Sequence, residues 1–309
     1  MTAGVDWIAV DWIAVDWGTS RLRAWAFGPD GAEVARARSD SGMGGLARDG
    51  FEPALLALID PWLGSGQITP VIACGMVGAR QGWAEAPYRA VPCKPPGPAE
   101  AIAAPTRDPR IAITILPGVS QSSPADVMRG EETQVAGFLS ANPDFDGTLC
   151  LPGTHTKWVQ VSAGEIVSFR TVMTGDLFAA LAGHTVLRHS IGAGEDRPAF
   201  LEAVADAMAR PEALTARLFS LRAEGLLSGL APETAAARAS GLLIGVDLAG
   251  ARGYWLGTRL AVIGSGSLAE LYAAALAAQG AVPERADAEA MVLAGLKAAR
   301  AAMTRKDQE

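Results

Sequence analysis

The order of apolar and polar residues predicts a chain of alternating strands and helices. Short runs rich in β-branched and aromatic residues, often ending at Gly or Pro, are typical of strands. We expect strands over residues 11–17, 21–28, 32–38, 69–74, 111–116, 147–151, 157–162, 165–172 and 259–263. Helical spacing of apolar residues, or a high Ala and Leu content, predicts helices over residues 51–62, 131–140, 176–189, 197–209, 211–224, 232–251, 268–278 and 286–303. Residues 75–100, rich in Gly, Pro and aromatic residues, are expected to form an ordered loop region.

One arrangement of elements occurs twice along the chain. Gly18-Thr19 and Gly153-Thr154 each follow an apolar strand and precede a hairpin. Such an internal repeat predicts two domains of like topology. Asn142-Pro143 marks the break between them. We therefore expect one domain over residues 11–143 and a second over 144–309, with the last helix packing back on the first domain.

The N-terminus repeats a short sequence. The segment Asp6–Val10 recurs as Asp11–Val15, and a third copy begins at Asp16. The length of this repeat fits neither the period of a helix nor that of a strand. We therefore interpret residues 1–10 as a duplicated extension that has no role in the fold.

Composition narrows the class of protein. Of the 309 residues, 50% are hydrophobic and 19% are charged, which is enough apolar material for two buried cores. The net charge is −7 and there is no long run of Lys and Arg, which argues against a nucleic-acid partner. The three cysteines form no C-x-x-C pair, which argues against a disulfide scaffold or a thiolate zinc site and fits a reducing compartment. No stretch reads as a membrane span or a signal peptide, so we expect a cytoplasmic protein with no membrane partner.

Three glycine-rich turns, each directly after a predicted strand, are candidates for phosphate binding. Such turns expose backbone N–H groups that attract oxyanions, and glycine lets the anion approach because it has no Cβ. A single turn of this kind is more often an ordinary β-turn, but three at strand ends favour a phosphate site. The candidate residues are Gly18, Thr19, Ser20, Gly153, Thr154, His155, Lys157, Gly264, Ser265 and Gly266. Two of them also have a structural interpretation, in which His155 only shapes its turn and Lys157 only begins an exposed strand.

Asp16 lies at the end of the strand before the first turn. A carboxylate beside a phosphate site suggests Mg²⁺, because this ion prefers hard oxygen ligands and offsets the repulsion between two negative groups. We therefore expect Asp16 to hold the metal ion.

The three turns also carry a resemblance to a known superfamily. Asp16–Ser20 is similar to the first phosphate motif of the sugar kinase, heat-shock chaperone and actin superfamily, Leu151–Lys157 to its second phosphate motif, and Val262–Ser267 to its adenosine motif. More closely, the chain resembles the 2-keto-3-deoxygalactonokinase family. The segments that carry this match are Gly75–Trp83, Glu85–Tyr88, Met128–Gln134, Pro152–Trp158 and Met173–Phe178. The family usually has Glu at the position of Asp176.

The resemblance implies an α/β fold of two ribonuclease H-like domains, each with a mixed five-stranded sheet and flanking helices, around an ATP cleft. It implies that ATP, with Mg²⁺, phosphorylates a small sugar acid, 2-dehydro-3-deoxy-D-galactonate, at its 6-hydroxyl. In that reaction the first two turns would hold the β- and γ-phosphates, and the third would hold the adenosine and the α-phosphate. The residues expected to bind the sugar acid are Met76, Arg80, Gln81, Tyr88 and Asp176.

The base and the carboxylate-binding cation each have more than one candidate. Glu131 and Glu132 begin a predicted helix, and either could take the hydroxyl proton. Neighbours on a helix point in different directions, so at most one of them faces the substrate. Both could instead form a solvated acidic first turn that suits the helix dipole. For the substrate carboxylate, arginine is the best-suited cation, and Arg80 is the first choice among Arg21, Arg80, Arg89 and Arg129.

Other functions remain compatible with these motifs. A kinase for another sugar or sugar acid, or a phosphatase or ATPase of the same fold, would use the same turns. A sugar-sensing protein would bind its ligand without accumulation of ADP. Gly264-x-Gly266-x-x-Ala269 matches a dinucleotide fingerprint in form, but too few residues follow it to complete the βαβ units of an oxidoreductase. The sequence leaves open whether the chain is a monomer or a homodimer.

Overall fold

The computed structural model describes residues 10–306 of the chain. These residues form two compact units. The N-terminal unit holds residues 10–144, 164–166 and 289–306, and the C-terminal unit holds residues 145–163 and 167–288. The last helix therefore belongs to the N-terminal unit, although it follows the C-terminal unit in sequence.

A six-stranded mixed sheet forms the centre of the N-terminal unit. Its order is β3 (Glu33–Ser39), β2 (Leu22–Phe27), β1 (Trp12–Trp17), β4 (Thr69–Gly75), β7 (Ile111–Ile115) and β6 (Ile102–Ala104). Strands β1, β2 and β3 form an antiparallel meander, β4 is parallel to β1, and β7 is parallel to β4. These five strands have the ribonuclease H-like order that the resemblance implies. The sixth strand, β6, pairs antiparallel with β7 and corrects the expected count of five.

Both faces of this sheet are apolar because helices cover both. The odd-numbered residues of β1 from Ile13 to Trp17 pack in a cluster with α1 (Phe51–Ile59). On the opposite face, Trp12 and its neighbours pack against α9 (Ala288–Lys306). The alternation of side chains along a strand explains why one apolar run serves two helices.

The start of the fold differs from the expected boundary by one residue. Val10 is only 7% exposed and belongs to the same apolar cluster as α1, so it is part of the core. The interpretation of residues 1–9 as a duplicated extension lies outside the described residues.

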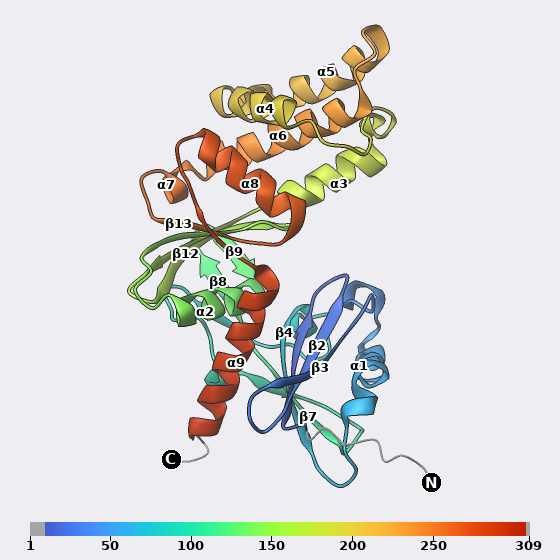
Figure 1. Ribbon diagram of the computed structural model, residues 1–309, viewed down its shortest axis with the longest axis vertical. Coiled ribbons are helices and arrows are strands. Elements are labelled where there is room, and N and C mark those ends of the chain that lie inside the picture. Colours follow the sequence, from blue (N-terminus) through green and yellow to red (C-terminus); the bar gives the residue numbers. More distant parts are fainter. Residues whose placement is uncertain (1–9, 307–309) are drawn as a thin grey trace. The chain divides into compact units, whose positions relative to one another are not determined.

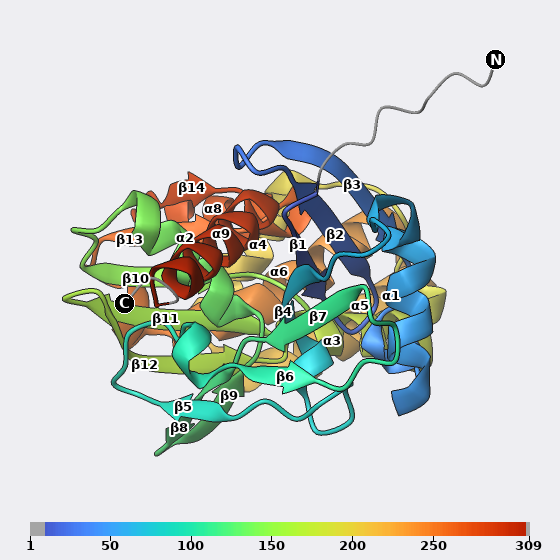
Figure 2. The same ribbon diagram turned by 90° about the horizontal axis from the view of Figure 1, so that it is seen from below.

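Helix α2 (Glu131–Ala141) lies beside α9, as Figure 2 shows, and two glycines allow this close approach. A Cβ at Gly137 would lie 1.9 Å from the carbonyl oxygen of Met291, and a Cβ at Gly295 would lie 2.0 Å from that of Thr133. Both distances are far below a van der Waals contact, so any other residue would force the helices apart. The contact fixes the first turn of α2 in place.

A second, three-stranded sheet precedes α2. It consists of β5 (Tyr88–Ala90), β8 (Gly118–Ser122) and β9 (Ala125–Met128). The sequence pattern predicts only a loop where β5 lies and predicts neither β8 nor β9. The β8–β9 hairpin, rather than β7, therefore leads directly into α2. Short 3₁₀ helices occupy the segments Met43–Gly45, Arg48–Gly50, Asp60–Trp62, Met76–Gly78 and Pro98–Glu100.

The C-terminal unit repeats the order of the first five strands. Its sheet contains β12 (Glu165–Val172), β11 (Thr156–Ser162), β10 (Gly147–Leu151), β13 (Leu260–Ile263) and β14 (Glu284–Ala286). Strand β10 is antiparallel to β11 and parallel to β13, which is parallel to β14. The predicted repeat of topology is confirmed. The antiparallel pair also excludes the all-parallel sheet of a dinucleotide-binding domain.

Helices make up the rest of the C-terminal unit. They are α3 (Thr174–His184), α4 (Arg197–Ala209), α5 (Leu214–Leu227), α6 (Pro232–Gly250), α7 (Arg252–Trp255) and α8 (Gly266–Ala278), with 3₁₀ turns at Val186–His189 and Pro211–Ala213. Helices α4, α5 and α6 pack together in a bundle (Figure 1). The helix expected over residues 176–189 is interrupted at Thr185, and the last helix begins at Ala288 because β14 occupies residues 284–286.

Candidate functional site

Polar groups gather in the N-terminal unit where strands β1 and β4 end. Asp16 pairs in register with Cys74, and Trp17 with Gly75, so the two parallel strands end at the same edge. Gly75 has a φ of +92°, and a Cβ there would lie 2.7 Å from the carbonyl oxygen of Trp17. Gly130, with a φ of +111°, directly precedes α2, and a Cβ there would lie 3.3 Å from the Cα of Gly75. The two glycines thus bring the first turn of α2 against the strand ends.

Asp16 is held by an arginine at this edge. The Arg23 guanidinium donates to Asp16 Oδ2 from Nη2 and, at 3.1 Å, from Nε. The same guanidinium lies 3.1 Å from Glu289 at the start of α9. Burial raises the pKa of the Asp16 carboxyl above its usual value, and the Arg23 charge opposes that rise. Arg23 therefore keeps Asp16 oriented and favours its charged form.

The donor chemistry at this edge fits a magnesium ion held largely by other ligands. Mg²⁺ commonly keeps several waters and takes one or two protein carboxylates together with substrate phosphates. Among residues 10–306, no three or more His, Cys, Asp and Glu side chains are grouped to hold a metal. Asp16 is the carboxylate that the chain would offer, and water and phosphate would complete the shell.

Glu131 and Glu132 are neighbours in sequence but occupy different environments. Glu132 is 1% exposed, and its carboxyl accepts the backbone N–H of Gly130 at 2.7 and 2.9 Å. Burial and the nearby Glu131 charge raise the pKa of Glu132 from 4.5 to about 8. Glu131 is partly exposed and accepts the backbone N–H of Arg129 at 3.1 Å. Of the two residues, Glu131 is therefore the more exposed.

The first glycine-rich turn is supported by a segment that the sequence analysis missed. Gly18 donates its N–H to the carbonyl of Arg21 at 2.9 Å, which closes the turn and leaves Thr19 exposed. Ser20 is exposed as well. Gly42 packs directly on the turn, since a Cβ there would lie 2.3 Å from the carbonyl oxygen of Thr19. In the sequence, the glycines at positions 42, 44 and 45 could have indicated that this segment packs closely on the turn.

The second turn is held by the start of α3. A Cβ at Gly175 would lie 2.5 Å from the carbonyl oxygen of Gly153, and Asp176 donates its N–H to the carbonyl of Thr154 at 2.9 Å. Thr154 and His155 are exposed, and His155 Nε2 lies 3.5 Å from the Asp176 carboxylate. Lys157 is only 5% exposed, so it does not begin an exposed strand as the structural interpretation has it.

The third turn lies beside the second. A Cβ at Gly264 would lie 3.6 Å from Pro152, because β10 and β13 are neighbouring parallel strands. Gly266, with a φ of +71°, begins α8. The hydroxyl of Ser265 donates to Asp287 at 2.7 Å and fixes the turn. Two predicted phosphate turns therefore meet at one edge of the C-terminal sheet.

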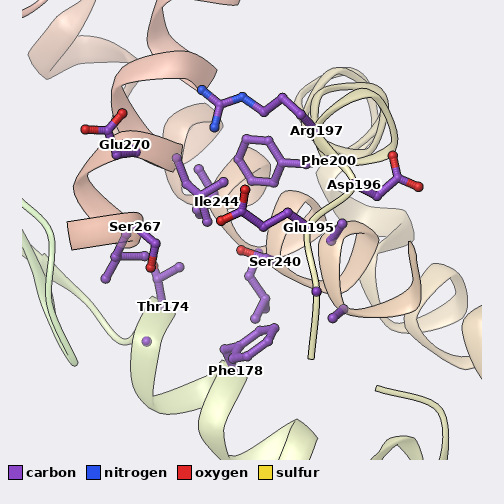
Figure 3. Close-up of a pocket in the computed structure, with 17 residues that line it drawn as sticks. Thr174, Phe178, Glu195, Asp196, Arg197, Phe200, Ser240, Ile244, Ser267 and Glu270 are labelled. Carbon is purple, nitrogen blue, oxygen red and sulfur yellow. The ribbon is translucent and has the colours of Figure 1, made fainter. Parts of the chain in front are cut away.

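A cavity of about 490 Å³ opens beside these two turns within the C-terminal unit. Figure 3 shows that its walls come from α3, α4, α6, α8 and the segment before α4. The ring of Phe200 and the side chains of Phe178 and Ile244 give it an apolar interior, and the Arg197 guanidinium lies 5.9 Å from the Phe200 ring centre. Its polar lining residues are Thr174, Glu195, Asp196, Arg197, Ser240, Ser267 and Glu270. Because these residues come from separate segments of the chain, no local sequence pattern predicts the cavity.

The residues expected to bind the sugar acid are divided between the two units. Met76 and Tyr88 lie on short elements of the N-terminal unit, whereas Asp176 lies on α3 of the C-terminal unit. The side chain of Arg80 is 81% exposed and lies 3.4 Å from Glu85. Gln81 is exposed as well.

Arg129 is the arginine that the structure places beside the candidate base. Its side chain is buried, donates to the carbonyl of Ala86 at 2.8 Å, and lies 4.2 Å from the centre of the Tyr88 ring. Its Nη1 atom is buried and has no hydrogen-bond partner among residues 10–306. A buried guanidinium with unused donor capacity, one residue before Gly130, is a stronger candidate for anion recognition than the exposed Arg80.

Comparisons with known proteins find similar sequences and a similar structure. A sequence model of the family described as 2-keto-3-deoxy-galactonokinase matches residues 16–299. A Rhizobium meliloti (strain 1021) protein assigned as the 2-dehydro-3-deoxygalactonokinase DgoK1 is 41% identical over 311 residues, covering 97% of each chain. The 2-dehydro-3-deoxygalactonokinase of Escherichia coli (strain K12) is 35% identical over 241 residues, covering 77% of this chain and 79% of the relative. A crystal structure of a Sinorhizobium meliloti protein assigned to the same activity has a TM-score of 0.85 at 41% identity, covering 94% of this chain and 99% of that one.

Proposed function

Since the chain belongs to the 2-keto-3-deoxy-galactonokinase family, we propose that it uses ATP to phosphorylate 2-dehydro-3-deoxy-D-galactonate at the 6-hydroxyl. The products are 2-dehydro-3-deoxy-6-phosphogalactonate and ADP, as expected of a kinase in galactonate catabolism. The chain is an enzyme, a sugar-acid kinase that transfers a phosphoryl group to an alcohol.

One observation supports the nucleotide part of this proposal above all others. In the C-terminal unit, an apolar cavity of about 490 Å³ adjoins two glycine-rich turns. Gly175 both lines the cavity and packs on the second turn, and Ser267 lines it directly after the third. A ligand with a flat base at one end and phosphates at the other matches this combination of cavity and turns.

Phosphoryl transfer needs positioning and charge neutralisation more than covalent chemistry. We assign the backbone N–H groups of residues 18–20 and 153–155 to the β- and γ-phosphates, and those of residues 264–266 to the α-phosphate and adenosine. Asp16 would hold Mg²⁺, which supplies positive charge to the phosphates when bound. Its orientation by Arg23 supports this role.

Glu131 is our candidate for the base that takes the proton from the substrate hydroxyl. Glu131 is partly exposed, whereas Glu132 is buried and its carboxyl has a raised pKa. Arg129 and Tyr88, rather than Arg80, are our candidates to recognise the acidic end of the sugar, with Met76, Gln81 and Asp176 as further candidates. His155 would donate a hydrogen bond to phosphate.

The proposal also covers the cellular location and the oligomeric state of the protein. Within residues 10–306 no helix has the length and apolar character of a membrane span. We propose a cytoplasmic location because Cys74, Cys93 and Cys150 are free thiols and the reaction needs ATP. Sedimentation would decide between a monomer and the homodimer that the sequence leaves open.

The decisive experiment is a coupled ADP-release assay across a panel of 2-keto-3-deoxy sugar acids, with ³¹P NMR of the product. We expect turnover with the galactonate derivative and a new phosphomonoester signal from its 6-position. Faster turnover with another sugar acid would show that this other acid is the substrate. Release of phosphate without acceptor would indicate an ATPase or phosphatase, and ligand binding without ADP would indicate a sensor.

A further inference from the structure

Asp247 of α6 is a buried carboxylate with no role in the chemistry described above. It is 2% exposed, and three side chains donate hydrogen bonds to it. The indole of Trp158 donates to Oδ1 at 2.8 Å, the hydroxyl of Thr174 donates to Oδ2 at 2.8 Å, and the hydroxyl of Tyr272 donates to Oδ2 as well. The hydroxyl of Thr156 lies 2.8 Å from that of Tyr272 and extends the network.

The donors come from three elements that border the nucleotide features of the C-terminal unit. Trp158 lies on β11, which follows the second turn. Thr174 begins α3, lines the cavity, and is followed by Gly175, which packs on that turn. Tyr272 lies on α8, which begins within the third turn, and it follows Leu271 of the cavity wall.

A carboxylate is well suited to join these elements. It only accepts hydrogen bonds, and its two oxygens can serve several donors at once. Burial raises the pKa of Asp247, and the three hydrogen bonds oppose that rise. A buried acid whose partners are neutral side chains adds little stability compared with apolar packing, but it specifies one arrangement of its donors.

Building on the proposed function, we propose that Asp247 is a positioning residue for the nucleotide. It holds β11, α3 and α8 in the one arrangement in which the second turn, the third turn and the cavity bind the same ligand. Asp247 itself does not line the cavity.

Three variants test this role. Asp247→Asn keeps the shape but replaces one acceptor oxygen with a donor. Tyr272→Phe removes one hydroxyl from the network, and Tyr272 is 0% exposed and does not line the cavity. The matched control is Thr148→Val, which removes one buried hydroxyl that donates to the carbonyl of Tyr254 at 2.6 Å, on β10 of the same sheet.

The primary measurement is ADP binding by isothermal titration calorimetry, with steady-state kinetics and thermal unfolding alongside. We expect Tyr272→Phe to weaken ADP binding and raise the KM for ATP by about tenfold, which corresponds to about 1.4 kcal/mol, and Asp247→Asn by more. The KM for the sugar acid should stay within about twofold of wild type. The indole N–H resonance of Trp158 should shift in Asp247→Asn.

The control separates positioning from stability. Thr148→Val should lose a similar amount of stability and still bind ADP as wild type does. Wild-type ADP affinity in Tyr272→Phe, or equal weakening in Thr148→Val, would overturn the positioning role. A wild-type protein that binds ADP but phosphorylates no sugar acid would instead contradict the proposed function, so the two failures are distinguishable.

Discussion

The contrast between Glu131 and Glu132 shows how one residue of sequence changes the chemistry of a side chain. Successive residues on a helix differ by about 100° in direction. The contact between α2 and α9 fixes which of the two side chains turns inward, and Glu132 becomes buried. The sequence predicted that at most one of them faces the substrate, but it could not say which, because that choice depends on a helix far away in sequence.

Glu131→Gln should lower kcat on the order of 10²-fold or more, because the amide cannot accept the hydroxyl proton. The KM for ATP should change little. Steady-state kinetics with both substrates varied would measure this, and Glu33→Gln, on strand β3 far from the first turn of α2 in sequence, serves as a control. A kcat close to wild type would remove Glu131 as the base.

The raised pKa of Glu132 predicts how stability depends on pH. Its carboxyl holds a proton up to about pH 8 in the folded protein but loses it near 4.5 when unfolded. The stabilisation that the protonated Glu132 gives the folded state is therefore fully present below pH 4.5 and is lost as the pH rises through 8. The free energy of unfolding falls by at most about 1.4 kcal/mol per pH unit.

Thermal unfolding of wild type and Glu132→Gln from pH 5 to pH 9 measures this difference. The variant should keep its Tm where that of wild type falls. Parallel curves for the two proteins would show that Glu132 does not titrate in this way.

Asp16→Asn should strongly lower kcat and raise the Mg²⁺ concentration needed for half-maximal activity, while ADP binding without metal changes little. The reason is that the amide is a poorer ligand for a hard cation. The control is Asp11→Asn, which removes another ion-paired acid just before β1, 3.0 Å from Arg300. An unchanged Mg²⁺ requirement in Asp16→Asn would dismiss the metal role.

At the scale of elements, the sequence predicted those with strong local patterns. The β1–β3 meander and the β10–β11 hairpin were predicted correctly because alternating apolar runs end at turn-forming glycines. Strands β6 and β14 were missed because each has three residues and no β-branched run. They form only because a neighbouring strand offers an unpaired edge, which is tertiary information.

The glycines between α2 and α9 give a prediction at this scale. Gly295→Ala should destabilise the protein by about 1–3 kcal/mol, since the new Cβ meets the backbone of α2 at 2.0 Å. Gly183→Ala is the matched control. It lies in α3, where a Cβ would meet no atom of the described residues within 4 Å beyond its own helix backbone and chain neighbours, so it should be neutral or slightly stabilising.

Denaturant unfolding of Gly295→Ala and Gly183→Ala provides the measurement. Equal free energies of unfolding for the two variants would show that α2 and α9 can move apart without loss of stability. Because the carbonyl that the new Cβ meets belongs to the first turn of α2, Gly295→Ala should also lower kcat.

At the scale of the molecule, the two units share a strand order that the internal repeat predicted. At the candidate site, the turns and Asp16 were proposed from local patterns, and their roles stay predictions. The cavity, Arg23 and Asp247 were not proposed, because each depends on contacts between elements distant in sequence. The preference for Arg80 over Arg129 came from motifs, and burial, which favours Arg129, cannot be read from a motif; the choice between them stays a prediction.

A chain that ends at Asp287 should lose the fold of its N-terminal unit. Val292, Leu296 and Ala299 of α9 are buried against Trp12 and other residues of the sheet, and their loss exposes that apolar face to water. Light scattering and tryptophan fluorescence would report aggregation and exposure of the sheet. A soluble, cooperatively unfolding truncated protein would contradict this expectation.

The return of α9 has a consequence for biosynthesis. A ribosome releases the chain from its N-terminus onward, yet residues 289–306 cover one face of the first sheet. Early-emerging strands must therefore wait, with part of their apolar surface uncovered, until these residues have been synthesised. We therefore expect chaperones to bind most strongly to nascent chains that are stalled before this helix has been synthesised.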